Sequence, residues 1–504
     1  MVSAQEGERL LYRRSVQGDS TENEDNPLLD IEASNPGDKR RLGLRSTTLL
    51  LMNRIIGAAM FSVPSSIILG VRSVGAALVL WIVGLALSFC GMFIWLELGC
   101  LMPRSGGEKV YLARAFPRPH GLSTTLYAFY ILLGFVGLGC VVVVENLLLA
   151  MNVNTGEIGK RALCLGVLLL TTALQCISPD LTLRIMNAVG LVKIAILLGL
   201  VLTGLAAIAG LIPKTKDPWR NFHQPFHGSS TDPYDYLVAL LKILASYEGW
   251  HNAAYVLDEV KDPVRTLKKS GILGLSMVGI LYLMANISCF IVASPEEIGD
   301  KGTRLVAVLL GTVFGDQTGR ITAAAVALST FGSLNSSSFA LARVVRELAA
   351  EGVIPAAGWV ANRSSSGTPT PLSFLFLFGS ALTAIILLPF GDAYFFLLDV
   401  TQYQMAVVCG AVAIALLLMR QRIPSEEYPF RVWIIAPYAF LACQLCLILT
   451  PFVSRDGHSD TGLPYWLAPV VAFLSICSGG LYWWWRKNER TLTGERQTYL
   501  EVRG

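Results

Sequence analysis

Near its N-terminal end the chain reads Asn53-Arg54-Ile55-Ile56-Gly57-Ala58-Ala59-Met60-Phe61-Ser62-Val63-Pro64, in the middle of an apolar segment over residues 46–71. That segment is long enough to cross a bilayer as a helix. Pro64 has no N–H, so the carbonyl of Met60 would lose its helical partner. Gly57, one turn earlier, tolerates backbone angles that other residues resist. The sequence therefore predicts a spanning helix that is broken near Gly57–Met60.

A second interruption, Ala245-Ser246-Tyr247-Glu248-Gly249-Trp250-His251-Asn252, lies in the apolar segment over residues 235–257. A helix in lipid satisfies its own backbone, so a break survives only where protein or a water-filled cavity receives the freed groups. Two such breaks, one opening each half of a long membrane protein, are typical of a transporter's binding site. We expect the second break near Ser246–Gly249, next to the first. The alternative for the first stretch is a proline-kinked helix that packs through small residues.

The composition requires a membrane. Hydrophobic residues make up 53% of the chain and charged residues 15%, and the mean hydropathy is +0.55. We predict an all-α integral membrane protein, because about twelve apolar segments approach the roughly 20 residues of a transmembrane helix. They lie approximately at residues 46–71, 74–101, 123–150, 161–178, 185–211, 235–257, 270–293, 319–342, 371–390, 393–419, 432–452 and 464–485.

The charges in the loops predict the orientation. Lys and Arg residues gather in the loops after even-numbered spans, which places these loops and both termini in the cytoplasm. The net charge of +4 then reflects topology, and no nucleic-acid partner is expected. Residues 1–45 are polar and lack apolar periodicity, which predicts a disordered cytoplasmic tail with either a trafficking role or no specific role. No cysteine or histidine pair has the spacing of a metal site.

Two charged residues lie deep within the predicted spans. A carboxylate such as Glu248 costs at least roughly 2.5–3.5 kcal/mol at mid-membrane, so it is functional by default. It could carry a coupling proton, pair with a cationic substrate, or form a structural ion pair with Lys193 or Lys242. Lys193 could replace a metal cation by bridging carbonyls, or extend its head group toward the inner surface. Ser333, in a run of small and hydroxyl residues over 329–338, either packs helices together or lines a cavity beside Lys193.

Several motifs, in order along the chain, resemble one family. Arg54-Ile-Ile-Gly-Ala-Ala-Met-Phe61 is similar to the span 1 signature of amino acid–polyamine–organocation transporters. Pro103-Arg-Ser-Gly-Gly-Glu-Lys-Val-Tyr111, Tyr247-Glu-Gly-Trp250 and Asp258-Glu-Val-Lys-Asp-Pro263 resemble the L-type amino-acid transporter branch, most of all its fungal methionine-permease-type members. The resemblance continues through residues 331–355 and more weakly to the last span.

The resemblance implies a LeuT-like 5+5 inverted-repeat fold, with a ten-helix transport core over residues 46–419, two additional helices over 420–486 and a cytoplasmic tail over 487–504. It also implies that backbone groups of the two breaks hold the amino and carboxylate groups of a substrate. The substrate-binding residues are then Ile56, Gly57, Ala58, Ala59, Met60, Ser246, Tyr247, Glu248, Gly249, Trp250 and Phe331. Of these, Trp250 and Phe331 would shape the side-chain pocket. Lys193, Ser333 and Glu248 form the expected cation and coupling site.

Three positions depart from the family pattern. Ala59 stands where the family has a second glycine, which narrows access to the backbone, and Glu248 also stands where the family has a glycine. The substrate class therefore does not transfer safely. The segment Met151–Lys160 lacks the cysteine that binds a heavy chain in the animal branch, so no disulfide-linked heavy chain is expected.

Together these features predict a permease in the plasma membrane, a secondary transporter of neutral L-amino acids such as methionine. We expect alternating access around broken spans 1 and 6, independence from sodium, and coupling to protons through Glu248. The alternatives are a transporter of cationic amino acids or polyamines, and a non-transporting nutrient sensor. An enzyme is not expected, because no nucleophile–base pair, metal set or phosphate loop is present, and no cofactor is implied.

Overall fold

The computed structural model describes residues 44–102, 106–213, 215, 217–251, 262–355, 357–360, 370–387, 392–449, 464 and 466–501. The chain divides into two units, residues 1–41 and 42–504. The first unit, and with it nearly all of the predicted tail over 1–45, lies outside the described residues. Everything below concerns the second unit.

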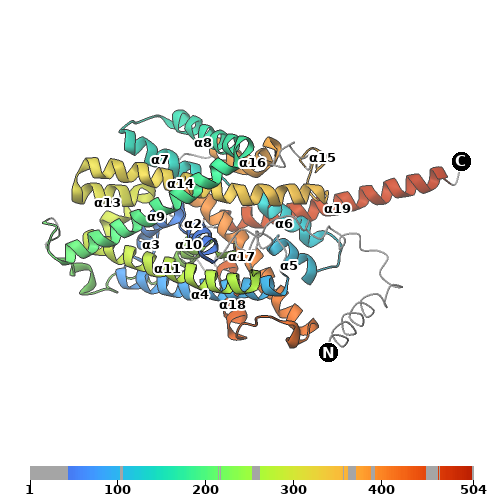
Figure 1. Cartoon of the computed structure of the whole chain (residues 1–504), viewed down its shortest axis with the longest axis horizontal. Coiled ribbons are helices and arrows are strands. Elements are labelled where there is room, and N and C mark those ends of the chain that lie inside the picture. Colours follow the sequence, from blue (N-terminus) through green and yellow to red (C-terminus); the bar gives the residue numbers. More distant parts are fainter. Residues whose placement is uncertain are drawn as a thin grey trace, which may run out of the picture. The chain divides into compact units, whose positions relative to one another are not determined.

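Every regular element among the described residues is a helix (Figure 1). The α-helices are α2 (Leu44–Ile55), α3 (Ala58–Val71), α4 (Val74–Leu101), α5 (Glu108–Ala115), α6 (Leu122–Leu132), α7 (Gly139–Met151), α8 (Glu157–Ile177), α9 (Pro179–Ile208), α10 (Pro233–Tyr247), α11 (Pro263–Val292), α12 (Pro295–Gly299), α13 (Leu305–Phe314), α14 (Asp316–Ala350), α15 (Ala357–Val360), α16 (Pro371–Leu387), α17 (Asp392–Arg422), α18 (Ile435–Leu449) and α19 (Leu467–Glu501). In the part of the chain that the structure describes, short 3₁₀ turns at η1 (Arg220–Phe222), η3 (Gly302–Arg304) and η4 (Ser425–Glu427) lie between the helices.

The helices suit a membrane by length and composition. Six of the described helices, namely α4, α8, α9, α11, α17 and α19, are long and apolar enough to span a bilayer, and the bent pair α2 and α3 makes a seventh. The shorter apolar helices include α6, α7, α16 and α18. An all-α, multi-span membrane fold is thereby confirmed, whereas the number of twelve spans stays a prediction.

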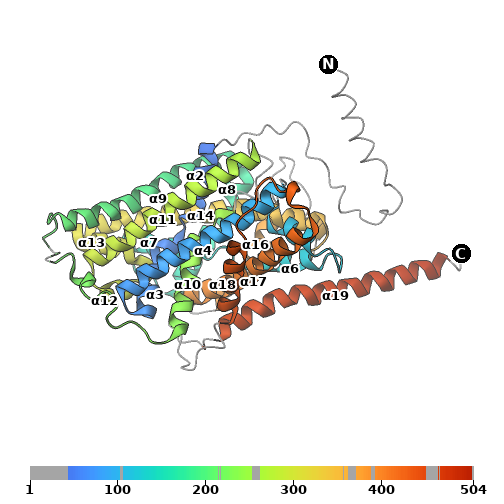
Figure 2. The same cartoon turned by 90° about the horizontal axis from the view of Figure 1, so that it is seen from below.

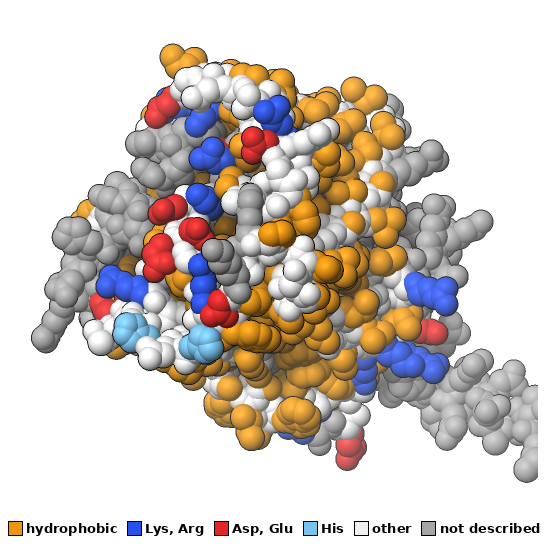
Figure 3. Space-filling model, turned by 90° about the vertical axis from the view of Figure 1, so that its left-hand side faces the viewer, with side chains coloured by type: hydrophobic (Ala, Val, Ile, Leu, Met, Phe, Trp, Pro, Cys, Tyr) orange, Lys and Arg blue, Asp and Glu red, His pale blue; other side chains and the backbone are white. Residues whose placement is uncertain are grey.

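The outer surface of the bundle is apolar. Large side chains point outward along several helices, for example Leu169, Leu202 and Ile280, which are 61%, 62% and 63% exposed. Figure 3 shows a broad hydrophobic surface beside a region where charged side chains gather. Exposed apolar surface of this extent is typical of contact with lipid.

The helices in the middle of the bundle carry the interruptions predicted from the sequence. Helix α14 packs along α7 and α9, while α10 packs against α3 and α4, and α11 against α2 and α9 (Figure 2). The ends of α2, α3 and α10 therefore lie inside the bundle. Chain that leaves a helix there is surrounded by protein, which can receive its freed backbone groups.

The third predicted span, over residues 123–150, is not continuous. Helix α6 ends at Leu132 and α7 begins only at Gly139. Between them Phe135 and Gly137 have φ angles of +48° and +119°, which no helix contains. We did not predict this interruption, because apolar composition reports depth in the bilayer and says little about the path of the backbone.

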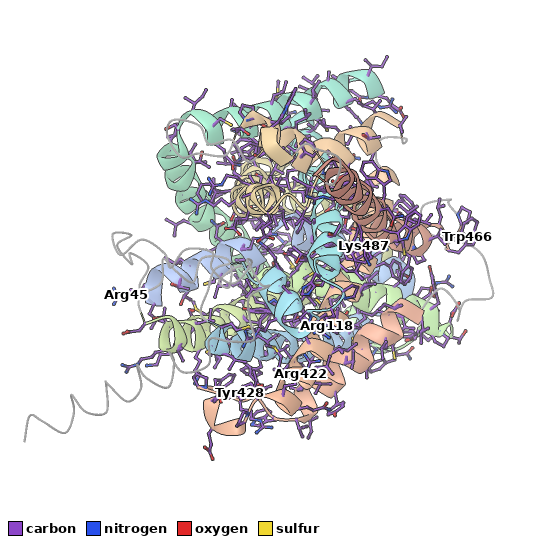
Figure 4. The ribbon with its side chains drawn as sticks, turned by 90° about the vertical axis from the view of Figure 1, so that its right-hand side faces the viewer. Arg45, Arg118, Arg422, Tyr428, Trp466 and Lys487 are labelled. Carbon is purple, nitrogen blue, oxygen red and sulfur yellow. The ribbon has the colours of Figure 1, made fainter. Side chains whose placement is uncertain are left out.

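Loops predicted to be cytoplasmic meet at one end of the bundle. Arg422 Nη1 donates to the carbonyl of Ala115 at 2.9 Å, and Lys109 pairs with Glu351 at 2.6 Å. Figure 4 views this end, with Arg118, Arg422 and Lys487 labelled. The loops after spans 2, 8 and 10 thus share one side, as the charge pattern predicts. Helix α19 runs past residue 487 to Glu501 without a change of secondary structure.

Candidate functional site

The predicted break in span 1 is present. Helix α2 ends at Ile55, Gly57 is extended with φ −110° and ψ −169°, and α3 starts at Ala58. The two helices are bent by 41°. Tyr282 donates its hydroxyl hydrogen to the freed carbonyl of Ile55 at 3.0 Å, so this backbone group is satisfied inside the protein.

The break lies slightly earlier than the sequence predicted. Pro64 is accommodated inside α3, and Ala58, Ala59 and Met60 form the first turn of that helix. The unwound part is therefore Ile56–Gly57, with α3 presenting its N-terminus there. Glycine sets the position of the break because the proline removes only one hydrogen bond within a helix whose neighbours support it.

The break in span 6 touches the break in span 1. Helix α10 ends at Tyr247, Glu248 is extended, and Gly249 has a φ of +128°. A Cβ atom on Gly249 would lie 2.8 Å from Cγ of Arg54 and 3.0 Å from its carbonyl carbon. Glycine is needed here for both its backbone angle and its lack of a side chain. Residues 252–261 lie outside the described part of span 6.

A cavity of about 220 Å³ lies against these two breaks. Four of the predicted site residues line it, namely Gly57, Ala59, Glu248 and Ser333. The remaining lining comes from α2, α6, α7, α10, α14 and α17, from the segment between α6 and α7, and from His251. The cavity thus touches every helix that carries an interruption.

The other predicted substrate residues do not line this cavity. Ile56, Met60, Ser246 and Tyr247 are at most 2% exposed and pack into the helix bundle. Trp250 lines a second, smaller cavity. Gly249 and Phe331 line neither cavity. The side chain of Ala58 lies outside the described side chains.

Glu248 faces the main cavity with one side-chain partner. Gln402 of α17 donates from Nε2 to Glu248 Oε2 at 3.2 Å. Among the described residues no Lys, Arg or His nitrogen comes within ion-pair distance of this carboxylate. The alternative of an ion pair with Lys193 or Lys242 is therefore not realised, and Lys242 instead donates to Ser66 Oγ at 2.6 Å.

Lys193 is fully buried and bridges span 1 to α14. Its Nζ donates to the carbonyl oxygen of Asn53 at 2.7 Å and to Ser333 Oγ at 2.6 Å. Ser333 Oγ also lies 3.4 Å from the carbonyl of Ile56. A side chain with 0% exposure does not reach a membrane surface, so the alternative of a head group extended to the interface is wrong.

Sequence reasoning missed Arg54 as a cavity residue. Its side chain lines the cavity and donates from Nη1 to Ser337 Oγ of α14. The cavity therefore contains a permanent positive charge from span 1 and a carboxylate from span 6. The signal in the sequence was Arg54 itself, a charge beside the break inside an apolar segment.

The interruption of span 3 was also missed. All six residues from Gly134 to Gly139 line the cavity. Two polar side chains of α17 satisfy its carbonyls: Gln404 Nε2 donates to Leu133 O at 3.1 Å, and Thr401 Oγ1 lies 3.4 Å from Gly134 O. Three glycines within six residues, at 134, 137 and 139, were the signal available.

The cavity lining is polar at the helix breaks. It combines backbone groups at helix interruptions with the carboxylate of Glu248, the guanidinium of Arg54 and the imidazole of His251. Among the described residues no group of three His, Cys, Asp or Glu side chains could hold a metal ion. Helix N-termini favour anionic groups and unwound carbonyls favour cations, so the site suits a molecule that carries both charges.

Comparison with known proteins gives the family. The family model for amino acid permeases matches residues 42–475. The high-affinity methionine permease of Saccharomyces cerevisiae is 32% identical over 482 residues, which cover 92% of this chain and 83% of that protein. The low-affinity methionine permease of the same yeast is 26% identical over 452 residues, with coverage of 88% and 82%. The b(0,+)-type amino acid transporter 1 of Rattus norvegicus is 25% identical over 467 residues, with coverage of 92% and 93%. The matched region contains both breaks and the cavity between them, and the chain belongs to the amino acid permease family.

Proposed function

We propose that this permease is a secondary active transporter of neutral L-amino acids such as methionine. It works by alternating access around the interrupted spans 1 and 6, within an inverted-repeat core over residues 46–419 followed by two additional helices over 420–486. The observation that carries the proposal is the cavity of about 220 Å³ against the contact between Gly249 and Arg54. The names of the two yeast relatives support methionine as a substrate.

The amino acid zwitterion is held by backbone groups. The N-terminus of α3 at Gly57 carries the positive end of the helix dipole and receives the α-carboxylate, while carbonyls at the end of α10 receive the α-ammonium group. The cavity also has apolar lining from Ile131, Leu334, Leu341 and Leu398, which suits an uncharged side chain.

A second candidate substrate is a cationic amino acid or polyamine. The carboxylate of Glu248 favours it, because it faces the cavity without an ion-pair partner among the described side chains. Arg54 lines the same cavity and repels a distal positive charge. We therefore assign Glu248 to the coupling proton and the substrate to the neutral class.

Transport is proposed to be independent of sodium. The ammonium of Lys193 takes the place of a bound cation, since it bridges the carbonyl of Asn53 and the hydroxyl of Ser333. The plasma membrane and cytoplasmic termini are the proposed setting, supported by the distribution of basic loops. A covalently linked heavy chain is not part of the proposal, because Met151–Lys160 contains no cysteine.

One experiment tests the proposed function. The purified protein in proteoliposomes takes up labelled methionine in sodium-free buffer, with and without an inward proton gradient, in competition with unlabelled amino acids. We expect uptake that the gradient increases and that neutral amino acids inhibit more strongly than lysine, arginine or spermidine. Stronger inhibition by the cations would move the assignment to the second candidate, and absence of any uptake would favour a sensor.

A further inference from the structure

A second cavity lies behind Glu248. It has a volume of about 40 Å³ and is enclosed by α4, α10, α17 and α18. Glu248 and Gln402 line both this cavity and the main one. The hydrogen bond between their side chains, 3.2 Å long, therefore forms part of the wall that separates the two spaces.

The small cavity is lined by the amide group of a buried glutamine. Gln444, in the middle of α18, is 4% exposed and lines the cavity. Its side chain makes no hydrogen bond to any described residue. Burying an amide group without a hydrogen-bond partner is costly. A ligand that both donates and accepts hydrogen bonds is needed at this place.

The remaining polar lining points to the same ligand. Ser88 donates its hydroxyl hydrogen to the carbonyl of Gly84 at 2.8 Å, which leaves oxygen lone pairs available at the cavity wall. Glu248 Oε1 is a further acceptor. A polar cavity can hold a water molecule when its volume exceeds about 10–15 Å³ and two to four polar partners are present, and each water in the liquid takes about 30 Å³. The volume of about 40 Å³ and the four polar side chains, Ser88, Glu248, Gln402 and Gln444, suit about one or two waters.

We propose that this cavity is a permanent internal water site, and that Glu248 exchanges its proton with this water while the substrate fills the main cavity. An amino acid bound in the main cavity displaces the water on that side of Glu248. Proton exchange with the carboxylate then needs water on the other side, in the small cavity. A hydronium ion there transfers its proton to a carboxylate oxygen and leaves water, and the reverse step releases the proton. This second part rests on the proposed coupling role of Glu248, whereas the water site itself does not.

Other titratable groups line the two cavities beside Glu248. The pH dependence of transport therefore includes the titration of these groups as well as that of Glu248. Arg54 of α2 keeps a permanent positive charge at the main cavity. The rest come from α6, the end of span 6 and α17, namely Tyr130, His251, Tyr394 and Cys409.

Radiolytic hydroxyl-radical labelling of the full-length protein in nanodiscs tests the water site without any transport measurement. Met405 and Cys409 line the small cavity and are only 7% and 4% exposed. Met419 and Cys289, each 2% exposed, line neither cavity and serve as matched controls. Because sulfur side chains oxidise readily when radicals form beside them, we expect at least fivefold faster oxidation of Met405 and Cys409 than of the controls. Equal rates would overturn the proposal.

Two variants remove the water in different ways. Ala406→Leu fills the cavity and Gln444→Leu removes its unpaired amide, and either should bring Met405 labelling down to that of Met419. Ala442→Leu, the same kind of change on the exposed side of α18, should leave labelling unchanged. Persistent labelling in both cavity variants would contradict the assignment.

Proteoliposome transport then tests the role of the water. For Gln444→Leu, accumulation driven by a proton gradient should fall at least fivefold relative to substrate exchange in the same vesicles, and Gln444→Asn should restore part of it. An unchanged ratio, in a variant that has lost Met405 labelling, would refute proton transfer through this water. If wild-type accumulation ignores the gradient, the proposed function fails, while the labelling result still decides the water site.

Discussion

Lys193 Nζ donates a hydrogen bond to the carbonyl oxygen of Asn53 at 2.7 Å, across 140 positions of sequence. The same ammonium group binds Ser333 Oγ at 2.6 Å. One buried positive charge thus joins the first half of span 1 to α14, close to the break at Gly57. This buried charge contributes to stability through its two hydrogen bonds. Removal of the ammonium would leave a buried carbonyl and a buried hydroxyl without their donor, which is costly.

Replacement of this lysine should uncouple the two helices. We expect Lys193→Met to lower the maximal uptake rate at least tenfold, while the wild type transports equally in sodium and in sodium-free buffer. Labelled uptake in proteoliposomes measures both. Lys269→Met, on an exposed position of α11, is the control and should behave as the wild type. Wild-type uptake that requires sodium would contradict the built-in cation.

The contact between the two breaks should not tolerate a Cβ atom. Gly249→Ala places one 2.8 Å from Arg54 Cγ and requires a φ of +128°, a strain of about 1–3 kcal/mol. We expect a lower melting temperature in detergent and loss of uptake. Gly199→Ala, in α9 with open space around the position, should keep or slightly raise stability, because alanine favours a helix over glycine. Equal melting temperatures for the two variants would argue against the contact.

The sequence predicted the two breaks because Gly57 and Pro64 interrupt the first apolar segment, and a polar run over residues 246–252 interrupts the second. It did not predict which side of each helix faces the cavity. Trp250 was expected to shape the side-chain pocket, but it lines the smaller cavity, and its ring packs against that of Trp95 with centroids 5.0 Å apart. Helix rotation of this kind is set by contacts between spans, which no local pattern contains. The break in span 3 was not predicted for a related reason. Its free carbonyls accept hydrogen bonds from α17, more than 260 residues away in the sequence, and a local pattern does not show such a contact.

The hydrogen bond from Gln404 to the carbonyl of Leu133, at the break in span 3, should contribute to the stability of the protein. Gln404→Leu leaves the carbonyl of Leu133 without its donor, which costs about 1–3 kcal/mol for a buried group. We expect a lower melting temperature and a reduced uptake rate, because the segment from Gly134 to Gly139 forms part of the cavity wall. Gln421→Leu, the same change at an exposed position of the same helix, is the control. A melting temperature for Gln404→Leu that matches the control would show that the bond contributes little.

A variant of Glu248 can separate its two proposed roles, as the carrier of a coupling proton and as the partner of a cationic substrate. Its carboxylate faces the cavity and accepts a hydrogen bond from Gln402, and Glu248→Gln keeps its shape while removing the titratable proton. If the residue carries the coupling proton, the variant should lose gradient-driven accumulation of methionine but retain measurable exchange, since the site still binds the zwitterion.

If Glu248 instead pairs with a cationic side chain, Glu248→Gln should weaken inhibition by lysine, arginine or polyamines. Both readouts come from the same proteoliposomes, with Glu296→Gln at an exposed position of α12 as the matched control. A folded Gln variant with unchanged accumulation, pH dependence and selectivity would refute both roles. We expect the first outcome, because Arg54 at the same cavity already disfavours a cationic substrate, and a proton is the one positive charge that Glu248 binds and releases within each cycle.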